Sequence, residues 1–127
     1  MIAAFYCVAI NGVLPILWAG VAKATAGFQI KHNTQPREFL GKQTGMSVRA
    51  NAAQANAWEA FAPFAAAVII AFIAGADQSK LNTLALCFTG LRVVYGVLYI
   101  TNLHLLRSLV WSLALLCNLA CYGLLVF

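Results

Sequence analysis

The sequence has few charged residues. Only 9% of its 127 residues are charged, eight of them basic and three acidic, whereas 63% are hydrophobic. A soluble domain usually has roughly 25% charged residues. So few charges on a chain of this length would leave most of a globular surface apolar. This composition excludes a soluble monomer and favours a protein whose solvent is a lipid bilayer.

Charges are absent from long stretches of the chain. None occurs in residues 1–22 or 108–127, residues 50–76 contain only Glu59, and residues 81–106 contain only Arg92. A membrane-spanning helix needs about 20 consecutive, mainly apolar residues. We therefore predict an all-α fold, an integral membrane four-helix bundle that forms a single domain over residues 1–127. The predicted helices cover approximately residues 2–25, 48–76, 81–101 and 105–127.

The three connections between these helices differ in length and charge. Residues 27–47 form the only long polar stretch, and we expect a long loop there. The third connection is very short, so the last two helices should be antiparallel neighbours. Basic residues flank the first and third connections, whereas Lys80 is the only basic residue at the second. The positive-inside rule then places connections one and three in the cytoplasm and both termini outside, in the periplasm of a bacterium.

The net charge of +5 is therefore mainly a topology signal. We expect no nucleic-acid partner, because no basic surface domain is present to bind one. We also expect no metal site, because the cysteines lie in apolar runs without a Cys-x-x-Cys pair or histidines at ligand spacing. We expect all four cysteines, Cys7, Cys87, Cys117 and Cys121, to act as buried small hydrophobic side chains.

The most informative residues are the ionisable ones inside the apolar stretches. A charged side chain at the centre of a membrane helix costs at least ~2.5 kcal/mol, so Glu59 and Arg92 need partners or a polar cavity. Tyr95 and Tyr99 follow Arg92 at i+3 and i+7, which places all three on one helix stripe. The simplest alternative is a structural ion pair between Glu59 and Arg92, with the tyrosines in an interfacial belt.

A second polar face lies on the preceding helix. Arg49, Asn56 and Glu59 fall within an arc of about 80° at 100° per residue. Arg107 lies in the first turn of the last helix, and Trp111 and Asn118 follow on roughly the same face. We expect Trp111 to be a packing or interface anchor. Together the polar faces predict a pocket open to the cytoplasm that binds an anionic, hydrogen-bonding ligand.

These residues resemble the MAPEG superfamily, the membrane-associated proteins in eicosanoid and glutathione metabolism. The likeness covers the whole chain, and the segment Asn33…Pro36-Arg37 is similar to the bacterial branch. The motifs that carry it are Arg49-Ala50…Asn56-Ala57-Trp58-Glu59…Pro63-Phe64 and Arg92-Val93-Val94-Tyr95…Tyr99…Arg107.

The resemblance implies a homotrimer in the lipid membrane that uses glutathione as co-substrate, bound between neighbouring subunits near the cytoplasmic side. Asn56 and Glu59 would hold the glutathione backbone, and Arg107 would be the catalytic residue that stabilises the thiolate. The second substrate would be an apolar electrophile or lipid hydroperoxide arriving from the bilayer. The remaining residues expected to bind glutathione are Arg49, Arg92, Tyr95 and Tyr99.

Two other functions stay open at this point. Catalytic relatives often carry an additional arginine one turn before the asparagine, where this sequence has Ala52 or Ala53. Since the superfamily includes a lipid-binding protein without catalytic activity, a non-catalytic lipid-binding or scaffold trimer is the first alternative. The second is a small multidrug exporter built around Glu59, although several neighbouring arginines would repel cationic drugs.

Overall fold

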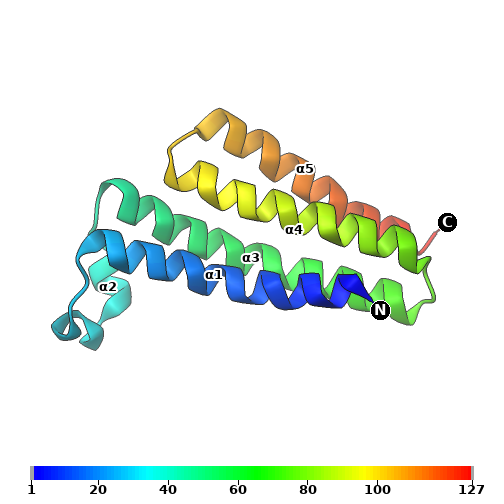
Figure 1. Cartoon of the computed structure of the whole chain (residues 1–127), viewed down its shortest axis with the longest axis horizontal. Coiled ribbons are helices and arrows are strands. Elements are labelled where there is room, and N and C mark those ends of the chain that lie inside the picture. Colours follow the sequence, from blue (N-terminus) through cyan, green and yellow to red (C-terminus); the bar gives the residue numbers. More distant parts are fainter. Residues whose placement is uncertain (1, 127) are drawn as a thin grey trace.

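The computed structural model describes residues 2–126, and all of its regular elements are helices (Figure 1). Four of the helices are long and apolar enough to cross a membrane. This confirms the predicted all-α fold with four membrane-spanning helices. The long helices are α1 (Ala3–Ala26), α3 (Gly45–Ile73), α4 (Gln78–Ile100) and α5 (His104–Gly123).

The first connection is more ordered than its polar composition indicated. It contains a short 3-10 helix, η1 (Ile30–Thr34), and a short α-helix, α2 (Pro36–Gly41). Pro36 stands at the start of α2, where its fixed φ favours a helix and its missing N–H costs nothing. Leu40 is buried in a small apolar cluster with Ala22 of α1 and Ala50 of α3. The connection is thus anchored against the bundle.

The four long helices pack as an antiparallel bundle (Figure 1). Contacts join α1 to α3 and α4, α3 to α4 and α5, and α4 to α5. The connection between α1 and α3 and the turn between α4 and α5 lie at the end opposite the two termini. That turn is very tight, and Asn102 adopts a φ of 64° in it, a left-handed conformation that asparagine tolerates better than most residues. The turn returns α5 directly alongside α4.

Small residues allow close approach of the helices. Gly96 of α4 faces Trp18 of α1 so closely that an added Cβ would lie 2.2 Å from Cζ2 of the indole. A buried hydrogen bond also joins these two helices: Nδ2 of Asn11 on α1 donates to Oγ1 of Thr89 on α4 over 2.8 Å. Large apolar side chains stay exposed on the outer faces, including Leu105, Leu109 and Leu116 of α5. Such surfaces suit contact with lipid or with another subunit.

Candidate functional site

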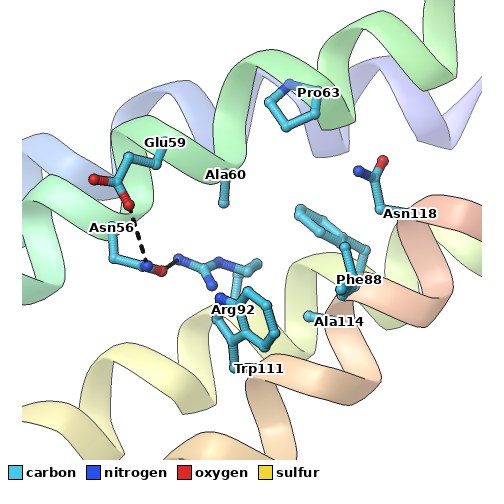
Figure 2. Close-up of a pocket in the computed structure, with 10 residues that line it drawn as sticks. Asn56, Glu59, Ala60, Pro63, Phe88, Arg92, Trp111, Ala114 and Asn118 are labelled. Carbon is cyan, nitrogen blue, oxygen red and sulfur yellow. Dashed lines mark hydrogen bonds between the residues drawn. The ribbon is translucent and has the colours of Figure 1, made fainter.

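The centre of the candidate site is a buried arginine. Arg92 of α4 is only 3% exposed, and its Nη2 donates to Oδ1 of Asn56 on α3 over 2.7 Å. The same asparagine donates through Nδ2 to Oε2 of Glu59 over 3.4 Å. Figure 2 shows Asn56 lying between the guanidinium and the carboxylate. The asparagine amide therefore bridges the two charged groups.

A direct ion pair between Glu59 and Arg92 is not formed. Within residues 2–126 the one ion pair joins Lys42 to Glu38, on the exposed surface of the first connection. The structural ion pair considered from the sequence is thus wrong. Glu59 is exposed, and its carboxylate is open to a further partner.

The tyrosines of α4 extend the site toward the turn with α5. The Cζ atom of Arg92 lies 4.4 Å from the centroid of the Tyr95 ring. Tyr95 and Tyr99 meet edge to face with their centroids 5.7 Å apart. The Cζ atom of Arg107 lies 4.1 Å from the centroid of the Tyr99 ring. Cation–π contacts at both ends hold the two guanidinium groups on the aromatic pair.

Local sequence explains this order of contacts. Residues 92, 95 and 99 recur on one stripe of α4 because three- and four-residue steps return to the same helix face. The turn at Thr101, Asn102 and Leu103 then reverses the chain, so that the first turn of α5 brings Arg107 back over Tyr99. We call the resulting series of contacts the polar chain. Its members are Glu59, Asn56, Arg92, Tyr95, Tyr99 and Arg107.

Arg49 makes a different contact. Its Nε donates to the carbonyl oxygen of Ile100 over 2.9 Å. That carbonyl is in the last turn of α4, where carbonyl groups lack a partner within the helix. In the described part of the chain, no hydrogen bond links Arg49 to Asn56 or Glu59, although the three residues share α3. Arg49 therefore fastens the start of α3 to the end of α4.

A pocket of ≈ 190 Å³ opens beside the polar chain, between α3, α4 and α5 (Figure 2). One end is polar, where Asn56, Glu59 and Arg92 meet Trp111. Asn56 and Pro63 are seven residues apart on α3, which corresponds to a length of about 10 Å at 1.5 Å per residue. The other residues that line the pocket are Ala60, Pro63, Phe88, Ala114, Leu115 and Asn118.

The far end of the pocket is mostly apolar. Phe88 stacks on the buried ring of Phe64, with their centroids 4.0 Å apart. The hydroxyl of Tyr122 on α5 donates to the carbonyl oxygen of Pro63 on α3 over 3.1 Å. This bond joins the two helices at the far end. Asn118 is the polar exception in this region and is 5% exposed.

Sequence reasoning did not identify the apolar wall of the pocket. Trp111 was expected to be an anchor, but its indole lines the polar end. Pro63, Phe88 and Ala114 carry no sequence signal that separates a pocket wall from ordinary core. Asn118 was placed from the sequence on roughly the same face of the last helix as Arg107, but it was not assigned to the ligand site, although a polar residue within an apolar helix marks a functional position.

The chemistry of the site favours an organic ligand that has charges of both signs. Arg92 and Arg107 can bind carboxylates, Glu59 can accept hydrogen bonds from an ammonium or amide group, and the tyrosine hydroxyls can do either. Among residues 2–126 no group of three or more His, Cys, Asp or Glu side chains could hold a metal ion.

Comparison with known proteins gives one result. Residues 3–127 match a family model described as MAPEG family, which covers nearly the whole chain. No curated protein and no solved structure matches the chain significantly.

Proposed function

Because the chain belongs to the MAPEG family, we propose that it is a membrane-bound glutathione-dependent transferase or peroxidase acting on apolar electrophiles or lipid hydroperoxides. The family implies membrane proteins with glutathione-dependent or related activity in general. The observation that carries the finer proposal is the polar chain, a continuous series of contacts from Glu59 to Arg107. Its members Glu59, Asn56 and Arg92 line the pocket.

Glutathione has the groups that the polar chain can bind. It has an ammonium group, two carboxylates and two amides, so it needs partners of both charges. Glu59 and Asn56 would hold its backbone, and Arg92, Tyr95 and Tyr99 would line its pocket. The Nη atoms of Arg49 would also bind glutathione, because only the Nε of this guanidinium is bound to Ile100. Arg92 is already held by Asn56 and Tyr95, so little side-chain entropy would be lost when the ligand binds.

Arg107 would supply the catalytic electrostatics. A cation beside the glutathione sulfur favours the thiolate, which is the nucleophile. In a transfer reaction the sulfur lone pair forms a C–S bond, the leaving group departs with its electron pair, and the thiol proton goes to solvent. In a peroxidase reaction the thiolate forms an S–O bond with the terminal hydroperoxide oxygen while the O–O bond breaks, which gives the sulfenic acid of glutathione and, after protonation, the alcohol. A second glutathione then yields the disulfide and water.

The second substrate would occupy the apolar part of the pocket. Trp111 and Leu115 line that pocket and are also exposed on the outside of the bundle. A hydrophobic molecule dissolved in the bilayer could therefore enter laterally. Membrane lipids and this small-molecule substrate are the non-protein partners that we propose.

The site is open on one side, which supports assembly of several subunits. Glu59 is exposed and Asn56 is half-buried in the single chain, although both lie inside an apolar span where exposure to lipid is costly. A neighbouring subunit in a homotrimer would cover them. We propose that each subunit is one transmembrane domain in the inner membrane of a bacterium, with the site facing the cytoplasm and both termini in the periplasm.

A conjugation assay tests this proposal. Purified protein in nanodiscs would be incubated with glutathione and an aromatic halide, and the thioether would be quantified by mass spectrometry. We expect a rate well above that of empty nanodiscs. The absence of any enzyme-dependent thioether or glutathione disulfide, across a set of halides and hydroperoxides, would contradict the proposal.

A non-catalytic lipid-binding or scaffold trimer is the second candidate. The position of the additional arginine of many catalytic relatives is occupied here by Ala52, which is half-buried, or by Ala53, which is fully buried in α3, so the chain lacks that cation. Native mass spectrometry that finds lipid retained in a trimer, together with no glutathione complex at millimolar concentration, would favour this function.

A further inference from the structure

The far end of the pocket contains a polar group to which the proposed chemistry assigns no role. Asn118 of α5 is 95% buried and lines the pocket. Figure 2 shows its carboxamide projecting from α5 toward Pro63 of α3, with the amide nitrogen on the pocket side. Its Oδ1 has no hydrogen-bond partner within residues 2–126.

An unpaired amide at this position is energetically unfavourable. A buried polar group without a partner costs about 1–3 kcal/mol. Leucine has nearly the same shape and would avoid that cost against Phe88 and Ala114. By contrast, the buried Asn11 pairs with Thr89 and with the carbonyl oxygen of Cys7. The Nδ2 group of Asn118 lies on the pocket side (Figure 2), so it can donate a hydrogen bond to an acceptor on a ligand that enters the pocket.

We propose that Asn118 is a specificity-determining residue that donates a hydrogen bond to an oxygen acceptor on the apolar second substrate. The preferred substrates are compounds with an aromatic or aliphatic body and a carbonyl or other acceptor oxygen at the end away from the reacting carbon. This inference rests on the proposed function, because it names the class of electrophile for that same site. Phe88, Pro63 and Ala114 contact the apolar body, and Asn118 binds the oxygen.

The geometry sets the length of such a substrate. Trp111 and Asn118 are seven residues apart on α5, about 10 Å along the helix at 1.5 Å per residue. Arg92 lies at the polar end with Trp111, and Asn118 lies at the far end. A molecule whose acceptor oxygen reaches Asn118 therefore places its other end near Trp111 and Arg92, about one helical turn of α5 from Arg107.

Equilibrium dialysis with two unreactive probes tests the role of Asn118 without glutathione. The probes are 4-methylacetophenone and 4-isopropyltoluene, which have similar shapes; the hydrocarbon has a methyl group where the ketone has its carbonyl oxygen. Each would be measured against nanodiscs containing the wild type or Asn118→Leu, and binding to empty nanodiscs would be subtracted. We expect Asn118→Leu to weaken ketone binding about tenfold, equivalent to roughly 1.4 kcal/mol. Binding of the hydrocarbon should be unchanged or tighter.

Leu115→Ala is the matched control. Leu115 lines the same pocket but has no polar atom in its side chain, so its truncation should weaken both probes to a similar extent. The proposal would be overturned if Asn118→Leu keeps its melting temperature and oligomeric state and also keeps the wild-type ratio of ketone affinity to hydrocarbon affinity. A protein that loses both probes equally would also overturn it, because Asn118 would then only shape the pocket.

Turnover separates this inference from the proposed function. If the wild type forms thioethers and Asn118→Leu keeps the wild-type preference between acetyl- and isopropyl-substituted benzyl halides, the inference fails and the transferase function stands. If the probes discriminate as expected but no thioether or disulfide forms, the transferase function fails and the role of Asn118 in ligand binding stands.

Discussion

The guanidinium of Arg92 is hydrogen-bonded to the side-chain oxygen of Asn56 at 2.7 Å, although a carboxylate belongs to the same cluster. The neutral amide leaves the charge of Arg92 uncancelled within a buried site. Glu59 bonds the other end of that amide over a longer 3.4 Å and keeps its own charge at the exposed edge. The Arg92 guanidinium and the Glu59 carboxylate are thus held apart, an arrangement that suits a ligand with charges of both signs.

The amide bridge predicts a double-mutant result. Asn56→Leu leaves a buried guanidinium without its acceptor, and we expect it to destabilise the protein by about 1–3 kcal/mol. Adding Arg92→Met removes the buried charge and should recover most of that loss. Thermal unfolding in detergent measures both effects. If the double variant is less stable than Asn56→Leu alone, the bridge does not hold Arg92 as described.

The close approach of α1 and α4 predicts that Gly96 cannot be replaced. A Cβ at this position would lie 2.2 Å from the Trp18 ring, and we expect Gly96→Ala to cost about 1–3 kcal/mol through overpacking. Gly90 is the matched control on the same helix, because an added Cβ there meets nothing within 4 Å. Gly90→Ala should be neutral or stabilise by about 0.5–1 kcal/mol. Equal melting temperatures for the two variants would contradict this packing.

The unpaired amide of Asn118 predicts a stabilising substitution. Asn118→Leu removes a buried polar group without a partner, so its melting temperature without ligand should equal or exceed that of the wild type. Asn11→Leu is the comparison, since that amide has two partners and its loss should destabilise the protein. A strongly destabilised Asn118→Leu protein would show that the amide has a partner in the folded membrane protein.

Arg107 should affect turnover more than binding. It contacts the Tyr99 ring at the end of the polar chain, and we expect Arg107→Ala to lower kcat about 100-fold, as loss of one electrostatic stabiliser does in other enzymes. The glutathione KM should change much less. Arg107→Lys keeps the charge and should retain more of the rate. Steady-state kinetics on the three proteins check this, and an unchanged kcat in Arg107→Ala would rule out the assigned role.

Composition and charge spacing predicted most of the fold. The four uncharged or nearly uncharged stretches correspond to α1, α3, α4 and α5 because a bilayer admits few charges inside a helix. The short helices η1 and α2 were not predicted. They depend on the burial of Leu40 against α1 and α3, a tertiary contact that polar composition does not reveal.

The candidate site was predicted in part. Helix periodicity placed Arg92, Tyr95 and Tyr99 on one stripe, and the structure adds that Arg107 reaches Tyr99 across the turn. Which polar groups pair was not predictable, because helix periodicity gives the face of a residue and not its partner. A direct pair of Arg92 with Glu59 was therefore one of two possibilities from the sequence, and in the structure Arg92 binds Asn56 instead. For the same reason, the contact of Arg49 with Ile100 emerged only from the structure.

Direct measurement of glutathione binding tests the central claim, that the polar chain is a glutathione site. The protein in nanodiscs would be titrated calorimetrically with glutathione, alongside Glu59→Gln. Glu59 is exposed, so this substitution removes the charge with little effect on the fold. We expect the wild type to bind with a Kd in or below the millimolar range and Glu59→Gln to bind about tenfold more weakly, the loss of one charge-assisted hydrogen bond. No heat of binding to the wild type at millimolar glutathione, or identical binding by both proteins, would contradict the claim.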